Sequence, residues 1–251
     1  MGTDRAGRRA ARWIPSPWLA LAGAALVVAV MVPPLGTLAR RYLYVESIQF
    51  CVLAIVAPAL IVLGAPRGTG SRPGRAAPQP GAAAPVVRSA VALCAWVGAC
   101  LVWRLPPVLD GLARGPLLAI AELATLLPAG ILLWLELAGP RPSGPRLARP
   151  WRAVAAAGAM WSVWIIAYIL GFSRGPVVHA YHSGSLGTAN DQEIAAVVLW
   201  LTSALSYVPL VFTPVITWLR DGADPREEPV GPYVSRGVRG WASGSPRQAR
   251  R

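Results

Sequence analysis

Residues 43–64 read LYVESIQFCVLAIVAPALIVLG, and Glu46 is the only charged residue among them. A helix needs about 20 mostly apolar residues to cross the hydrocarbon core of a bilayer. This stretch therefore predicts a transmembrane helix whose polar residues lie near its first turns.

The same pattern occurs five more times along the chain. Further spans are expected over residues 17–36, 86–105, 116–138, 153–172 and 194–218. The composition agrees, because 55% of the 251 residues are hydrophobic, 14% are charged and the mean hydropathy is +0.48. We therefore expect an all-α fold, a polytopic membrane bundle of about six transmembrane helices.

Segments rich in Gly, Pro and Arg separate these spans at 67–85 and 139–150 and are predicted loops. The expected organisation is a cytoplasmic basic N-terminus (1–16), a six-helix transmembrane domain (17–218) and a cytoplasmic, disordered tail (219–251). The basic start also fits a signal peptide. An uncleaved first span is preferred, because the apolar run continues to Val32 with no polar cleavage region.

The arginines indicate the orientation. All 24 basic residues are arginine, which is typical of GC-rich coding and favours a bacterial source. Four precede the first span, four lie in 65–88, four in 141–152 and seven in the tail, against five in the remaining segments. The positive-inside rule then places both termini in the cytoplasm of a bacterial plasma-membrane protein. Although the net charge is +13, these residues form no continuous patch, so nucleic acid is not an expected partner.

In this orientation, polar residues gather at the outer membrane face. They are Glu46, Gln49, Arg104, Asp110, Glu122, Asp191 and Gln192. Ionisable groups within spans are costly, so they usually pair or serve a site. Two interpretations stay open: interfacial or structural pairing, with Arg104 as the partner of the glutamates, and an outward cavity for an ion or a partner. Glu136, near the inner end of its span, is expected to reach the cytoplasmic interface.

Soft metal ligands lie in the same half of the predicted bundle. Copper(I) favours thiolate and thioether ligands, and Cys51 and Cys100 fall in the outer halves of their spans. His179 and His182 follow in an external loop. Against a metal site, cysteine is a common small apolar residue in helices, and two histidines are only half of a site. No phosphate loop, His-Glu-x-x-His helix or Gly-x-Ser-x-Gly elbow occurs, so the chain is not expected to be an enzyme.

Three blocks of the sequence stand out by their order. The first is Glu46-Ser-Ile-Gln49-Phe50, followed by Val56-Ala-Pro58-Ala-Leu and Leu63-Gly-Ala-Pro66. The second is Trp103-Arg104-Leu-Pro106 with Asp110 and Glu122-Leu123, and the third is Tyr181, then Asp191-Gln192 and Leu199-Trp200.

These blocks resemble the CtaG family of cytochrome c oxidase assembly factors. The first is similar to the family's His-Met-x-Gln-His, Ala-Pro-Pro-Leu and Leu-Gly-x-Pro, the second resembles Trp-His-x-Pro and Glu-His, and the third resembles the start of a late family span. The resemblance covers roughly residues 43–205.

The departures from the family pattern concern its histidines. This chain has Glu46, Phe50, Arg104 and Leu123 in their places. The residues that match the pattern are Gln49, Glu122, Asp191, Gln192 and Trp200. If Arg104 lies between Glu46 and Glu122, an internal salt bridge replaces a metal ion.

The resemblance implies a role in cytochrome c oxidase assembly, with oxidase subunits as partners and copper-centre maturation at the outer face. The missing histidines favour a scaffold over a copper carrier. Two alternatives remain: a small transporter or ion pathway lined by Glu46, Arg104 and Glu122, and a structural accessory subunit of a respiratory complex.

Overall fold

The computed structural model describes residues 17–65, 84–138, 148–181 and 187–223. The chain divides into two units, residues 1–215 and 216–251, and the buried core lies in the first. The expected N-terminus (1–16) lies outside the described residues, as do most of the two expected loops and residues 224–251 of the expected tail. The tail was expected from residue 219, whereas the last helix continues to Ala223.

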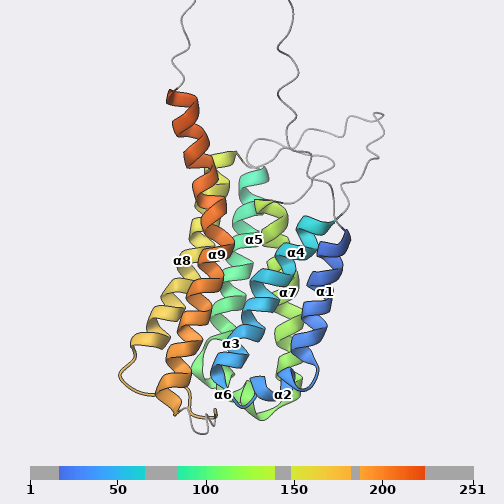
Figure 1. The fold of residues 1–251 in the computed structure, drawn as a ribbon, viewed down its shortest axis with the longest axis vertical. Helices are drawn as coiled ribbons and strands as arrows, with labels where there is room; N and C mark the ends of the chain where they lie inside the picture. Colours follow the sequence, from blue (N-terminus) through green and yellow to red (C-terminus); the bar gives the residue numbers. More distant parts are fainter. Residues whose placement is uncertain (1–16, 66–83, 139–147, 182–186, 224–251) are drawn as a thin grey trace, which may run out of the picture. The chain divides into compact units, whose positions relative to one another are not determined.

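The described part of the chain contains helices and no strand (Figure 1). The helices are α1 (Pro17–Met31), α2 (Leu35–Ala39), α3 (Leu43–Cys51), η1 (Val52–Val56), α4 (Ala57–Gly64), α5 (Ala84–Trp103), α6 (Pro106–Arg114), α7 (Pro116–Leu137), α8 (Arg149–Phe172) and α9 (Thr188–Ala223). The all-α prediction is confirmed.

Within the described ranges, five helices are long and apolar enough to cross a membrane. They are Leu43–Gly64, Ala84–Trp103, Pro116–Leu137, Arg149–Phe172 and Thr188–Thr217. The first expected span differs, because 17–36 forms the 15-residue α1 and then the start of α2. Pro33 and Pro34 interrupt it, since proline lacks the amide proton that a helix interior requires. At 1.5 Å per residue, α1 is about 22 Å long, against roughly 30 Å of hydrocarbon.

A short helix, α6, lies between two spans where an external loop was expected. It begins at Pro106, a residue type that the first turn of a helix accepts, and it buries Leu109 and Leu112. α6, α2 and the start of α3 lie at the same end of the bundle (Figure 1). We call this the α6 end, and it holds most of the predicted site.

The span Leu43–Gly64 changes its winding halfway along. At η1 the Ala57 amide donates to the carbonyl of Val52, five residues earlier, so this stretch is π-helical. Pro58 follows and cannot donate to the Ala54 carbonyl, which a regular helix would require. Trp96 of α5 supplies that donor, with its Nε1 2.9 Å from the Ala54 oxygen.

Glycines set how closely η1 and α4 pack on α7 and α1. A Cβ atom at Gly64 would lie 2.3 Å from the backbone nitrogen of Ala20 in α1. One at Gly130 of α7 would lie 2.6 Å from the Ala54 oxygen. These helices therefore approach backbone to backbone, as small residues allow in membranes.

Candidate functional site

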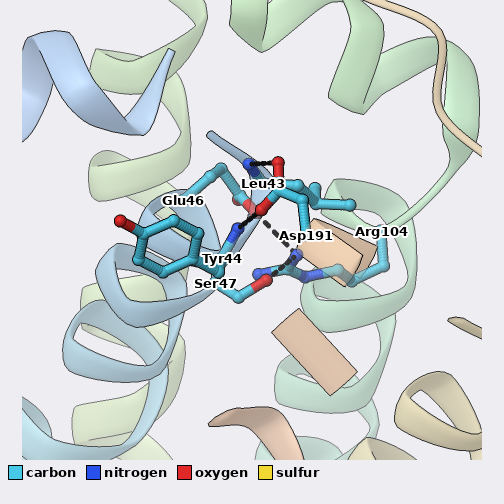
Figure 2. Close-up of polar contacts among 6 residues, drawn as sticks. All are labelled: Leu43, Tyr44, Glu46, Ser47, Arg104 and Asp191. Atoms are coloured by element: carbon cyan, nitrogen blue, oxygen red, sulfur yellow. Dashed lines mark hydrogen bonds and ion pairs between the residues drawn. The ribbon is translucent and has the colours of Figure 1, made fainter. Parts of the chain in front are cut away.

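A buried ion pair lies at the α6 end. Arg104, directly after α5, places Nη1 2.7 Å from Oε2 of Glu46 on α3, and the two side chains are 3% and 4% exposed. Nη1 also donates to Oγ of Ser47 at 3.2 Å (Figure 2). α5 ends at Trp103, and the chain turns before Pro106, so Arg104 points back into the bundle instead of towards solvent.

Phe50 forms one wall of this pair. The guanidinium carbon of Arg104 lies 3.9 Å from the centre of the Phe50 ring, which is fully buried. Glu46 and Phe50 are four residues apart and share one face of α3. An aromatic face attracts a desolvated cation, so Phe50 and Glu46 bind the same guanidinium in different ways.

Glu122 of α7 supplies a second buried carboxylate. Its side chain is 1% exposed and interacts electrostatically with both Glu46 and Arg104. Among the described residues, its Oε1 has no hydrogen-bond partner, and the same holds for Oε1 of Glu46 and for Nε and Nη2 of Arg104. Arg104 was expected to lie between Glu46 and Glu122. It forms a direct ion pair with Glu46 and a longer-range electrostatic interaction with Glu122.

Tyr181 closes the same cluster from the segment between α8 and α9. Its side chain is 3% exposed, and its hydroxyl lacks a hydrogen-bond partner among the described residues. Burial, together with the nearby Glu46 carboxylate, raises the pKa of Tyr181. The phenol therefore stays protonated, and its hydroxyl is an unused hydrogen-bond donor within electrostatic range of the two carboxylates.

Asp191, at the start of α9, caps the N-terminus of α3. Its Oδ2 accepts from the Leu43 amide at 2.9 Å and its Oδ1 from the Tyr44 amide at 2.8 Å. Figure 2 shows this contact beside the Glu46–Arg104 pair. The first amides of a helix have no partner within the helix and favour a negative charge. Asp191 thus fixes the helix that carries Glu46.

Two more predicted residues hold the segment between α8 and α9. Gln192 accepts from the Val177 amide at 2.9 Å and donates to the Leu170 carbonyl at 2.6 Å. Asp110 of α6 accepts from the amides of His179 and Ala180 at 2.9 and 2.8 Å. Both side chains hold the backbone of this segment, which ends at Tyr181, within electrostatic range of the buried pair.

The last two predicted residues lie apart from this cluster. Gln49 donates to the sulfur of Met31 in α1 at 3.3 Å. Trp200 is 53% exposed and packs edge-on against Trp164, with ring centres 5.5 Å apart. The structure therefore brings Glu46, Arg104 and Glu122 together, surrounds them with the capping residues, and leaves Trp200 on an exposed surface of α8 and α9.

The metal candidates do not form a site in the described part of the chain. No group of three or more His, Cys, Asp or Glu side chains there is arranged to hold a metal ion. Cys51 and Cys100 are buried free thiols within electrostatic range of each other, with the Arg104 cation beside them. His179 is exposed, and His182 lies outside the described residues. Among the described residues, these candidates therefore do not assemble into a group of three or more ligands.

A second ion pair, between buried Glu136 and the half-exposed Arg88, lies towards the other end of α7 and outside the predicted site. Glu136 was expected to reach the interface, but it is 9% exposed. It accepts from Arg88 at 2.9 Å and from Ser89 at 2.6 Å, both on α5. This contact joins α5 to α7. The partners are separated by 48 and 47 residues along the chain, and no local sequence pattern predicts such a contact.

Residues 1–221 match the family described as cytochrome c oxidase caa3 assembly factor (Caa3_CtaG). The matched range covers the described helices up to residue 221 of α9, and it includes the whole cluster around Arg104. Neither a curated protein nor a solved structure matches the chain.

Proposed function

The chain belongs to the family of cytochrome c oxidase caa3 assembly factors, and from this membership we propose that it supports oxidase assembly as a membrane scaffold. In this role it docks against oxidase subunits through its helices and does not itself carry copper. The five apolar helices support such a role within the bilayer, as a multi-pass protein.

One observation supports the scaffold over the copper carrier: Arg104 places a positive charge inside the cluster. Its guanidinium lies 2.7 Å from Glu46 and against the Phe50 ring, at positions where the family pattern has histidines. A fixed cation repels a metal ion, and the Glu46 carboxylate is already paired with it. We therefore infer that the cluster stabilises the packing of α3, α5 and α7 and does not bind a metal ion.

The proposed orientation has the α6 end outside a bacterial plasma membrane and both termini in the cytoplasm. The arginine asymmetry supports it, since the basic segments precede α1, join α4 to α5, join α7 to α8 and follow α9. A cysteine introduced at exposed Gly175, between α8 and α9, is expected to react with a membrane-impermeant maleimide in intact cells. Labelling only after cell lysis would reverse this orientation.

The test of the function is the copper-to-haem ratio of terminal oxidase in membranes of a deletion strain, beside the complemented strain. A scaffold predicts less oxidase with an unchanged ratio, restored by complementation. A fall in copper at constant haem would instead assign copper maturation, and no change in either would favour a transporter. A protein that co-purifies with the oxidase at fixed stoichiometry would be an accessory subunit.

Cysteine variants sharpen this test. Cys51→Ala and Cys100→Ala remove the buried thiols, and Cys94→Ala, at an exposed position on the same helix as Cys100, is the matched control. The scaffold predicts full oxidase copper in all three, at equal protein abundance. Loss of oxidase copper in the two buried variants alone would contradict it.

A further inference from the structure

Three arginines from two distant segments of the chain, Arg40 and Arg41 from one and Arg114 from the other, line one open pocket at the α6 end. The pocket has a volume of about 630 Å³ and is lined by Arg40, Arg41, Ala113, Arg114, His179 and Ala180. Arg40 and Arg41 follow α2, Arg114 ends α6, and His179 lies between α8 and α9. The segments at this end of the spans carry five arginines, and three of them share the pocket.

The three arginines of this pocket have no direct carboxylate partner in the described part of the chain. Among those residues, none of the three arginines forms an ion pair, and Arg41 lies 5.7 Å from the Tyr42 ring centre. The nearby Asp110 carboxylate accepts from the backbone of His179 and Ala180 and so holds that wall in place. The pocket is therefore an open concavity lined by positive charge.

The arginines stand at the ends of the membrane spans. Arg41 is two residues before the span that begins at Leu43, and Arg114 is two residues before the span that begins at Pro116. Apolar side chains are exposed nearby in the sequence: Leu35 is 41%, Leu38 37% and Leu117 78% exposed. The three arginines thus lie within a few residues of exposed apolar side chains at the ends of the spans.

We propose that this pocket binds the phosphodiester headgroup of an anionic phospholipid. Guanidinium groups bind phosphate oxygens in pairs through their planar donors. The exposed leucines then contact the acyl chains of the same molecule. A soluble phosphate or an acidic protein segment would use the arginines alone, whereas a lipid also accounts for the adjoining leucines. The lipid site does not depend on the proposed scaffold function.

The test uses the purified full chain in mild detergent, titrated with short-chain phosphatidylglycerol or phosphatidylcholine and followed by native mass spectrometry. Phosphatidylglycerol is expected to bind about tenfold more tightly, or better. Arg40→Gln, Arg41→Gln and Arg114→Gln are each expected to weaken it about fivefold, the effect of one basic residue at an anionic surface. Arg174→Gln, an exposed arginine outside the pocket lining, is the matched control and should change binding less than about twofold.

Competitors separate the sources of the anion. Glycerophosphoglycerol, the headgroup without acyl chains, is expected to compete weakly, and Leu38→Ser and Leu117→Ser to weaken lipid binding only. Equal binding of the two lipids, equal loss in all four arginine variants, or a free headgroup as tight as the lipid would each overturn the proposal. Displacement by poly-glutamate below the lipid concentration would assign the pocket to an acidic protein instead.

Discussion

Arg104 contacts Glu46 and Phe50 at once, and Glu46 and Phe50 lie one helical turn apart on the same helix. Nη1 is 2.7 Å from Oε2 of Glu46, and the guanidinium carbon is 3.9 Å from the centre of the Phe50 ring. One residue after α5 therefore fixes both the rotation and the depth of α3. This makes the pair a structural element whose removal is measurable without any functional assay.

Arg104→Ala is expected to destabilise the protein by about 3–5 kcal/mol, because it leaves the Glu46 carboxylate buried and unpaired. The melting temperature in detergent should fall by about 10 °C. Arg174→Ala, at an exposed position, is the control. An Arg104→Ala protein that accumulates and melts like the parent would show the pair to be unimportant.

The double variant Glu46→Gln/Arg104→Gln tests whether the charge itself is needed. Removing both partners leaves neither of them as an unpaired charge, so its loss of stability should be less than about half that of Arg104→Ala. The check is a double-mutant cycle with Glu46→Gln and Arg104→Gln, from the same melting curves. Additive single effects would mean that the two side chains do not interact.

Asp191→Ala is expected to cost about 1–3 kcal/mol, since two amides at the start of α3 lose a charged acceptor. Asp191→Asn keeps one acceptor and should lose about half as much. Chemical denaturation in detergent measures both. Glu193→Gln, two residues along and outside the cap, should leave stability within about 0.5 kcal/mol.

Gly130→Ala is expected to destabilise by about 1–3 kcal/mol, because the new methyl group would lie 2.6 Å from the Ala54 oxygen and from Pro58 Cγ. Gly98→Ala is the matched control, because nothing lies within 4 Å of a Cβ there. That variant should be neutral or gain up to about 1 kcal/mol from helix propensity. Equal melting temperatures would argue against the close approach of α4 and α7.

Asp110→Ala should loosen the segment between α8 and α9. The amides of His179 and Ala180 lose their carboxylate acceptor, and their hydrogen exchange should accelerate about tenfold. Exchange mass spectrometry on a peptide covering 173–181 is the measurement, with a peptide from α8 as internal reference. Unchanged exchange would mean that other contacts hold this segment.

The spans could be predicted because each needs only length and apolar composition. Five of the predicted stretches form such helices. α6 could not be predicted, because Pro106, Pro107 and Gly111 are typical of loops and only its packed leucines reveal a helix. For α1 the sequence predicted too long a helix. The apolar run continues to residue 36, but the helix ends at Met31, before Pro33.

The site was predictable in outline only. Sequence order placed Glu46 and Arg104 at one membrane end, which made their pairing a reasonable hypothesis. The role of Asp191 was out of reach, because its oxygen bonds an amide 148 positions earlier, and no local pattern encodes such a contact. Three arginines in one pocket are likewise a result of folding, because their order in the chain says nothing of their convergence.

The π-helical stretch η1 has a consequence for how this chain tolerates deletions. A π turn holds one residue more than an α turn, and here the bond from the Ala57 amide to the Val52 carbonyl closes it. Deleting one residue from Val52–Val56 would convert the π-helical stretch to ordinary α-helix. α3 and α4 would then still face their present neighbours. Losing one codon from residues 59–63 would instead rotate Gly64 by about 100° away from Ala20. The middle of this span is thus the place where its length can change while Glu46 and Phe50 still meet Arg104.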